Sequence, residues 1–239
     1  MKSDIEQLKR LIDRAHRIVF FGGAGVSIAS GIPDFRSSEG LYSVVPEEVL
    51  SSTYFVLHTE EFYEFYRKHM LHPEAKPNAV HRYLYKLEKE DKLRGIVTQN
   101  IDGLHKKAGN IRVYELHGSV DENYCVQCDT MYGVDAVSDS EGIPRCSKCG
   151  GIIKPGIVLY GENLDKYTCI GATREITNAD LMIVAGTSLA VEPAASMVKD
   201  FGGKHLVVIN KEPTSADEKA ELVIREDVEY VFKELEAND

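Results

Sequence analysis

Four cysteines form two closely spaced pairs in the middle of the sequence. Two residues separate Cys125 from Cys128 and Cys146 from Cys149, and seventeen residues lie between the pairs. This spacing is typical of four thiolates that close tetrahedrally around one Zn²⁺. A single pair of this kind could be a redox dithiol or a disulfide, but two pairs at this separation favour zinc. Because four thiolates leave no open coordination position, we predict one structural zinc ion, not a catalytic one.

A glycine-rich segment follows a short apolar run near the N-terminus. The residues after Phe21 are GGAG, at positions 22–25. Such a turn after a strand lets backbone N–H groups approach the pyrophosphate of a dinucleotide. The third glycine of the G-x-G-x-x-G pattern is replaced by Ile28, so a plain tight turn is the alternative interpretation.

The loop beyond these glycines carries an acid, an aromatic ring and a cation in succession, Asp34, Phe35 and Arg36. A loop of this composition can cover a bound ligand. The alternative is a surface loop with an internal Asp–Arg ion pair.

Two further polar groups stand at predicted strand ends. Residues 98–102, TQNID, follow an apolar run, and open α/β sheets place their ligand contacts at the C-terminal ends of strands. The alternative is a polar turn between a strand and a helix. His117 ends another strand-like segment, just before Gly118, where it is either a functional or a structural histidine.

These candidate residues need elements that bring several strand ends together. Compact apolar runs at 18–21, 95–98, 181–185 and 205–209 lack polar alternation, which predicts strands covered on both faces. Four helices are predicted between and around these strands, from residues at helical spacing. The first has Ile5, Leu8, Leu11, Ile12 and Ala15 behind a cap at Ser3, and the second has Tyr83, Leu84 and Leu87 after a first-turn Pro77. The third has Ile170, Arg174 and Thr177 behind Asn163 or Asp165, and the last has Val228, Val231, Phe232 and Leu235. The alternation predicts an α/β fold, a Rossmann-like parallel sheet with helices on both faces.

Two stretches interrupt that alternation. We predict that residues 38–71 form a helical module and residues 123–153 a Cys₄ zinc module, which together make a small lobe. The remaining residues, 1–37, 72–122 and 154–239, are predicted to form the large Rossmann-like lobe.

Composition and charge narrow the classes of function. The 239 residues are 43% hydrophobic and 28% charged, as in ordinary globular proteins, and no apolar run approaches the roughly 18 residues that span a bilayer. The charged N-terminal stretch lacks the apolar core of a signal peptide, so we expect a cytoplasmic protein with reduced cysteines, in which Cys169 is a buried thiol. The net charge of −10 argues against nucleic-acid binding and favours a cationic partner, such as a lysine-rich protein segment.

Seven features, taken in order, resemble the sirtuins, the Sir2 family of NAD-dependent protein-lysine deacylases. They are GAGVSIASGIPDFR (23–36), TQNID (98–102), ELHG (115–118), the two cysteine pairs, KPGIVLYGENL (154–164), GTSLAVEPA (186–194) and VVIN (207–210). The resemblance runs from about residue 20 to residue 228, in a chain about the size of bacterial and archaeal members. It implies that the large lobe binds NAD and that an acyl-lysine peptide lies in the cleft between the lobes.

The resemblance also implies roles for individual residues. It assigns NAD to Gly23, Ala24, Gly25, Ser27, Asp34, Phe35, Arg36, Gln99, Asn100, Ile101 and Asp102, of which the last two meet the nicotinamide amide. It assigns the pyrophosphate and adenosine end to Gly186, Thr187, Ser188, Asn210, Lys211 and Val228. It assigns the peptide to Ile157, Val158, Leu159, Tyr160, Gly161 and Glu162. His117 is the implied general base, and Asn100 is also implied to be catalytic.

The implied reaction is NAD-dependent deacetylation of protein lysine. The acetyl oxygen attacks the anomeric carbon of the nicotinamide ribose and expels nicotinamide. A ribose hydroxyl, deprotonated with help from His117, then attacks the imidate carbon, which yields free lysine and O-acetyl-ADP-ribose. General-base assistance contributes about 10²- to 10⁴-fold, and Phe35 would shield the sugar from water. The implied partners are proteins or peptides that carry acetylated lysine, bound by a monomer, with no nucleic-acid or membrane partner.

Two positions depart from the family pattern. The run before Gly-Glu usually ends in two aromatics, and here it ends in Leu159 and Tyr160, which alters the floor of the acyl-lysine channel. The desuccinylase-like branch of the family has a Tyr-x-x-Arg motif in the helical module. Here His69, and not an arginine, stands three residues after Tyr66. We therefore predict that negatively charged acyl groups are poor substrates.

Two other hypotheses use the same residues differently. ADP-ribosyl transfer to a protein would follow if another nucleophile intercepted the activated sugar. A zinc-stabilised NAD-binding sensor would bind NAD without releasing nicotinamide, and the set of Asn100, Asp102 and His117 speaks against it.

Overall fold

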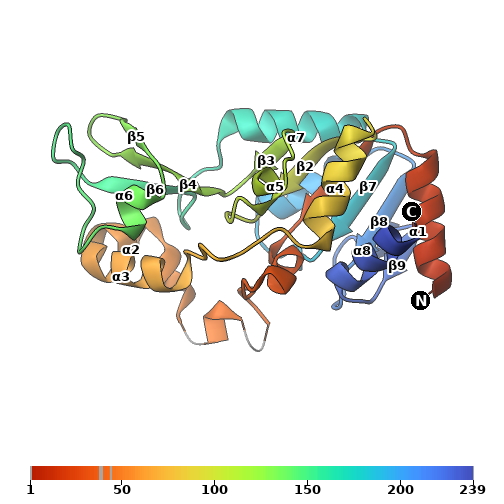
Figure 1. Ribbon diagram of the computed structural model, residues 1–239, viewed down its shortest axis with the longest axis horizontal. Coiled ribbons are helices and arrows are strands. Elements are labelled where there is room, and N and C mark those ends of the chain that lie inside the picture. Colours follow the sequence, from red (N-terminus) through yellow and green to blue (C-terminus); the bar gives the residue numbers. More distant parts are fainter. Residues whose placement is uncertain (1, 38–39, 44, 239) are drawn as a thin grey trace.

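The computed structural model describes residues 2–37, 40–43 and 45–238. Within these ranges the chain forms a large parallel sheet with helices on both faces, and a smaller antiparallel sheet beside further helices at one end (Figure 1). Residues 38 and 39, at which the helical module is predicted to begin, lie outside the described ranges. No helix in the described ranges has both the length and the apolar character that crossing a bilayer requires.

The strand order of the large sheet creates a ligand-binding position at its centre. Its described strands are β1 (Ile18–Gly22), β2 (Leu93–Thr98), β3 (Val113–Glu115), β7 (Leu181–Ala185), β8 (His205–Ile209) and β9 (Leu222–Ile224), in the order β3-β2-β1-β7-β8-β9. Every neighbouring pair is parallel. The chain moves outward from β1 to β2 and β3 and then returns to β7 on the other side of β1. The C-terminal ends of β1 and β7 therefore flank the topological switch point, where open α/β sheets bind ligands.

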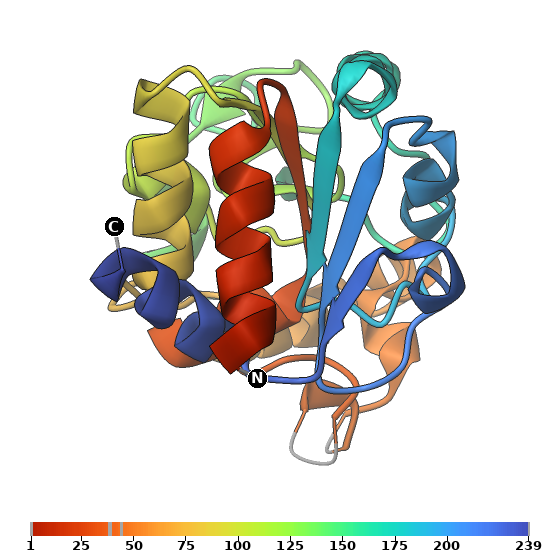
Figure 2. The ribbon, with the colours of Figure 1, turned by 90° about the vertical axis from the view of Figure 1, so that its right-hand side faces the viewer.

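Both faces of this sheet are covered, as the apolar strands predict. The helices α1 (Lys2–Arg14), α4 (Ala79–Lys89) and α8 (Val228–Ala237) pack on one face, to the left of the strands in Figure 2. Helix α7 (Lys166–Asn178) and a 3₁₀ segment (Ala194–Asp200) pack on the other. Successive strand residues alternate between the two cores, so that Phe20 enters the first and Phe21 the second. This arrangement confirms the predicted Rossmann-like fold.

The smaller sheet and its helices share a third core. Strands β4 (Gly118–Cys125), β5 (Met131–Tyr132) and β6 (Ile153–Ile157) pair antiparallel in the order β5-β4-β6. They pack with α2 (Ser52–Leu57), α3 (Thr59–His69) and α6 (Asp135–Ser138), and Phe62, Tyr63 and Tyr66 of α3 are buried there. Arg67 adds a polar link, since its Nε donates to the Val137 carbonyl at 2.8 Å. Segments 45–71 and 120–160 thus fold as neighbours although they are distant in sequence. The remaining short helix, α5 (Leu104–Lys107), follows the polar segment after β2.

Two predicted helix starts were wrong. Ser3 lies inside α1, whose described part begins at Lys2, and its hydroxyl donates to Asp4 at 3.2 Å. Pro77 precedes α4 and is not in its first turn, because Asn78 is the N-cap. The Asn78 side chain accepts from the Val80 N–H at 3.0 Å, so the stronger capping residue sets the boundary.

The face predicted for α7 was also wrong. Its buried residues are Ala172 and Ile176, whereas Ile170 is 55% exposed. The helix begins at the predicted cap Asp165, which accepts from the Thr168 N–H at 2.7 Å. Cys169, on the same helix, is half-buried and not the buried thiol that we expected.

Candidate active site and metal centre

A cavity of about 530 Å³ lies at the C-terminal ends of the central strands, within the range of small-molecule sites. Loops after β1, β2, β7 and β8 line it together with residues that flank β4 and β6. Most of the predicted site residues lie in its wall: Ala24, Gly25, Asp34, Phe35, Arg36, Gln99, Asn100, Ile101, His117, Ile157, Val158, Leu159, Tyr160, Gly161, Glu162, Gly186, Thr187, Ser188, Asn210, Lys211 and Val228. The parallel sheet brings together those of these residues that follow its strands, because all its strands end at the same edge, and the smaller sheet adds residues 157–162.

The glycines after β1 and β7 interlock at the switch point. The Gly25 N–H donates to the Gly186 carbonyl at 2.9 Å, and a Cβ on Gly25 would lie 2.7 Å from the Gly186 Cα. Gly23 does not line the cavity, and a Cβ there would lie 2.7 Å from the Thr187 Cβ. Gly23 therefore packs the two loops together, while Gly25 and Gly186 leave bare backbone at the edge of the cavity. This close approach fits the phosphate end of a dinucleotide.

Ser27 and Asp102 line a smaller hollow of about 40 Å³ beside the main cavity, and Ala24, Phe35, Met70, Asn100 and Ile101 line both. The Asn100 amide donates to the Ser27 hydroxyl at 3.1 Å, which in turn donates to the Asp102 carboxylate at 2.7 Å. Burial raises the pKa of Asp102, while hydrogen bonds from the Leu104 N–H and the Ser27 hydroxyl act in the opposite direction. This chain of hydrogen bonds fixes three of the predicted side chains relative to one another.

His117 is held in one tautomer. Its Nδ1 lies 2.9 Å from the Gln99 carbonyl, which can only accept, so Nδ1 carries the hydrogen. In the neutral ring Nε2 then has a free lone pair. Burial lowers the pKa of His117, which favours the neutral ring. An imidazole of this kind, in the wall of a cavity, can take a proton from a bound group.

The predicted peptide segment, residues 157–162, is attached directly to this histidine. The Val158 N–H donates to the His117 carbonyl at 2.9 Å. Within the segment, the Glu162 carboxylate accepts from the Leu159 N–H at 2.9 Å and from Lys154 Nζ at 3.1 Å. Lys154 is 6% exposed and also donates to the Ile157 carbonyl at 3.0 Å. The buried lysine thus holds both ends of a turn that lines the cavity.

The paired strands β4 and β6 approach each other very closely beside His117. Gly118 has φ +73°, and a Cβ on it would lie 1.9 Å from the Gly156 carbonyl oxygen. A Cβ on Gly156 would lie 2.0 Å from the Glu122 carbonyl oxygen. Only glycine fits at either position.

The sequence analysis missed several residues in the cavity wall: Ile28, Ser37, Tyr42, Leu50, Met70, Leu164, Ala190, Val191, Glu192, Pro193, Glu212, Glu226 and Asp227. Asp227 could have been found, because an aspartate just before a helical pattern is an N-cap signature. It caps α8 and pairs with Lys211 at 2.8 Å. Residues 190–193 could also have been found, because they belong to the segment GTSLAVEPA, which the sequence analysis singled out. Tyr42, Leu50 and Met70 carry no such pattern and reach the cavity through the tertiary fold.

The two residues compared with the desuccinylase pattern lie elsewhere. Tyr66 is fully buried in the third core, and His69 lines the smaller hollow. Met70, the next residue, lines both the smaller hollow and the main cavity.

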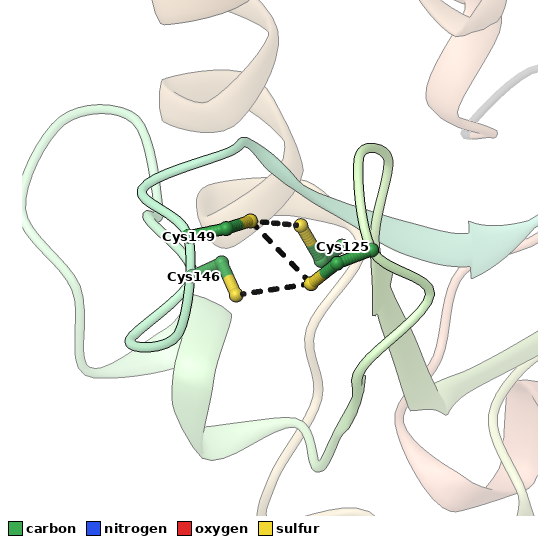
Figure 3. A group of neighbouring side chains, drawn as sticks. Cys125, Cys146 and Cys149 are labelled. Atoms are coloured by element: carbon green, nitrogen blue, oxygen red, sulfur yellow. Dashed lines mark hydrogen bonds between the residues drawn. The ribbon is translucent and has the colours of Figure 1, made fainter.

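The four cysteines converge on one point (Figure 3), with all four sulfur atoms within 4.8 Å of one another. Cys125 Sγ lies 3.4 Å from Cys149 Sγ, and Cys128 Sγ lies 3.6 Å from Cys146 Sγ. Four thiolates around zinc at about 2.3 Å would be separated by about 3.8 Å, so the cluster fits a tetrahedral zinc site. The Tyr132 hydroxyl donates to Cys146 Sγ at 3.1 Å and lowers the pKa of that thiol, as a metal-binding thiolate requires.

Comparison with known proteins identifies the family to which this architecture belongs. The family model described as Sir2 family matches residues 23–193. The chain belongs to the Sir2 family. A curated Sir2 relative from Clostridium perfringens, named NAD-dependent protein deacetylase, is 50% identical over 97% of this chain and 98% of its own length.

Solved Sir2 structures share the fold. One holds a Sir2 variant with deacetylated p53 peptide and 3′-O-acetyl-ADP-ribose; it is 37% identical, with a TM-score of 0.90 over 98% of each chain. Another, a Sir2 complex with p53 peptide and NAD⁺, is 37% identical, with a TM-score of 0.89 over 98% of each chain.

Proposed function

We propose that this Sir2 chain is an NAD-dependent protein-lysine deacetylase that converts acetyl-lysine, NAD and water to free lysine, nicotinamide and O-acetyl-ADP-ribose. The observation that carries the proposal is the position of His117. Its ring lines the same cavity as the interlocked glycine loops, and its carbonyl binds residue 158 of the predicted peptide segment. A proton acceptor, a dinucleotide cradle and a peptide-binding turn thus meet in one place.

The cofactor would lie across the switch point. Gly25, Gly186 and Thr187 would hold the pyrophosphate, while Asn210, Lys211 and Val228 would face the adenosine end. Asn100, Ile101 and Asp102 would hold the nicotinamide end beside the smaller hollow. When bound, NAD supplies the activated ADP-ribosyl group that accepts the acetyl oxygen as nicotinamide departs.

The residues of the chain have separate tasks in this reaction. His117 takes a proton from a ribose hydroxyl through Nε2, because Nδ1 is already engaged by the Gln99 carbonyl. Asn100 is held by Ser27, which keeps its amide at the edge of the cavity. Phe35 covers the reacting centre and excludes water.

The zinc ion supports this site from a distance. With four thiolate ligands it has no open position, so it would hold the loops that carry Cys125 and Cys146 and take no part in the chemistry. We also propose that residues 38–71 and 123–153 act as one small lobe against a large NAD-binding lobe formed by residues 1–37, 72–122 and 154–239. The enzyme would be monomeric and cytoplasmic, and its substrate proteins would bind in the cleft between the two lobes.

The decisive experiment follows nicotinamide release from NAD labelled in its adenosine part. We expect release only when NAD and an acetyl-lysine peptide are both present, with the label on a small molecule and the peptide lighter by one acetyl group. Label on protein would favour ADP-ribosyl transfer. Tight NAD binding without nicotinamide release would favour a sensor, and either result would overturn the deacetylase.

The acyl preference is a second prediction. Leu50, Met70 and Leu159 line the cavity and belong to one hydrophobic cluster, and Arg36 already pairs with Glu47 at 2.9 Å. A succinyl carboxylate would therefore be desolvated without a free cation. We expect a succinyl-lysine peptide to react at least about tenfold more slowly than its acetyl-lysine counterpart. Comparable kcat/KM values for the two peptides would refute this.

A further inference from the structure

Tyr160 lies where the predicted peptide segment, residues 157–162, meets the loop that carries Asp34, Phe35 and Arg36, called here the cofactor loop. Its backbone is fixed on both sides, because its N–H donates to the Leu50 carbonyl at 2.9 Å and its carbonyl accepts from the Ser52 N–H at 2.9 Å. These two hydrogen bonds tie the backbone of Tyr160 to residues 50–52. Its hydroxyl therefore has a defined position in the cavity wall.

Two polar groups of the cavity wall meet at this hydroxyl. Arg36 Nη2 donates to the Tyr160 hydroxyl at 3.1 Å, and the Tyr42 hydroxyl lies 3.1 Å from it. The Arg36 guanidinium also lies over the Tyr42 ring, 5.3 Å from its centroid. Burial, followed by the hydrogen bond to Tyr160, raises the pKa of Tyr42, so that this phenol stays protonated.

The cofactor loop transmits this contact to Phe35. In the described parts of that loop, residues 34–37 and 40–43, the Leu41 N–H donates to the Asp34 carbonyl at 2.8 Å and the Tyr42 N–H donates to the Phe35 carbonyl at 2.9 Å. The rings of Phe35 and Tyr42 lie 5.5 Å apart. A group that holds Tyr42 and Arg36 therefore also fixes Phe35.

We propose that the Tyr160 hydroxyl is a positioning group that fastens the cofactor loop to the peptide segment through Arg36 and Tyr42, and so couples peptide binding to NAD binding. The proposal rests on the proposed function. Tyr160 itself performs no chemical step, because it acts through the two residues that it holds. Of the usual pair of aromatics, Leu159 replaces the first, while Tyr160 keeps the second and adds this hydroxyl.

The test is Tyr160→Phe, which removes one oxygen and keeps the ring. Loss of a hydrogen bond to a charged group and one to a phenol predicts a rise of about 5- to 30-fold in KM for NAD at saturating acetyl-lysine peptide. We expect kcat to change by less than about twofold, since His117 and Asn100 are untouched. Tyr167→Phe is the matched control, because Tyr167 is 81% exposed on α7.

A double-mutant cycle with Tyr42→Phe tests the contact itself. We expect Tyr42→Phe to raise KM for NAD in the wild type and to have much less effect when Tyr160 is already phenylalanine. Additive effects would show that the two hydroxyls act independently and would overturn the proposal.

A third measurement needs neither NAD nor activity. Amide hydrogen exchange at Leu41 and Tyr42 in the free protein should be about 5- to 30-fold faster in Tyr160→Phe than in the wild type or in Tyr167→Phe. Unchanged exchange together with an unchanged KM would sink the inference. If the wild type released no nicotinamide, the proposed function would fail, while the exchange comparison would still decide whether Tyr160 holds the loop.

Discussion

The imidazole of His117 is positioned by a backbone carbonyl and not by a carboxylate. The Gln99 carbonyl orients the ring without adding a negative charge, so nothing in that contact pulls the proton onto Nε2 before a substrate does. This suits a base that must be neutral when the substrate arrives.

His117→Ala should reduce NAD-dependent deacetylation by about 10²- to 10⁴-fold, because it removes the proton acceptor. The melting temperature should change little, since the contact between the backbone of residue 117 and Val158 remains. Mass spectrometry of an acetyl-lysine peptide measures the first quantity and thermal unfolding the second. Full activity of the variant would end the role assigned to this residue.

Lys154 and Glu162 form the buried ion pair of the site, with side chains 7% and 29% exposed. Burial lowers the pKa of Lys154, and the Glu162 carboxylate opposes that shift. Glu162→Ala should lower the free energy of unfolding by about 3 kcal/mol, because it leaves a buried lysine without its carboxylate. Urea denaturation measures this loss.

The control is Glu229→Ala, which breaks the solvent-exposed pair with Lys233 on α8. It should cost less than about 1 kcal/mol. Equal losses in the two variants would mean that the buried pair has no special structural weight.

At the scale of elements, helices α4 and α5 enclose two buried histidines. The rings of His81 and His105 lie 4.6 Å apart, and His105 also packs against Phe20 of β1. Burial, together with Arg82 beside it, lowers the pKa of His81 to about 4, and burial and His81 lower the pKa of His105 well below its usual value. The neighbouring residue Asn78 links this region to the glycine-rich segment after β1 by donating to the Val26 carbonyl at 2.7 Å.

These pKa shifts predict a loss of stability in mild acid. Between about pH 6.5 and about pH 4 the unfolded chain binds protons that the folded chain does not, so the free energy of unfolding falls as the pH falls. We expect this fall to be shallower in His105→Leu, and unchanged in His16→Gln, whose side chain is exposed. Identical pH profiles for the wild type and His105→Leu would contradict the assignment.

The same scale shows how far the sequence alone could reach. The strands Leu181–Ala185 and His205–Ile209 were predicted to the residue, because each is a compact, mainly apolar run that follows a charged residue and ends at Gly186 or Asn210. Helix α7 was placed correctly and turned wrongly, since few of its residues are apolar and Ala172 is an inconspicuous core residue. Pattern predicts an element well, but its buried face depends on what packs against it.

The same limit applies to the site. Asn100, next to a strand end, was found because the topology of an open sheet makes such positions binding sites, whereas Gly186 was found through the resemblance to the sirtuins. Tyr42 and Met70 were missed because they come from outside the large sheet and reach the cavity only in the folded chain. The contact between Tyr160 and Tyr42 spans 118 positions in the sequence, and no local pattern encodes it.

At the scale of the whole molecule, the metal centre should be necessary for the fold of the smaller part of the chain. Cys146→Ser should lose bound zinc, lower the melting temperature and lose activity indirectly, because a structural zinc ion contributes folding free energy. Metal analysis of the purified variant and thermal unfolding measure both effects. Cys169→Ser is the control, since that thiol lies on α7 and outside the cluster, and it should keep zinc and activity. A Cys146→Ser protein with full zinc content and normal melting would rule out the Cys₄ site.

The close approach of β4 and β6 also limits which substitutions this gene can accept. Gly118 and Gly156 are only half-buried, and accessibility alone would class them as tolerant positions. Yet any added methyl group would strike the opposite backbone at about 2 Å, in the strand pair that follows His117. A saturation library selected for activity should therefore recover glycine codons almost exclusively at both positions.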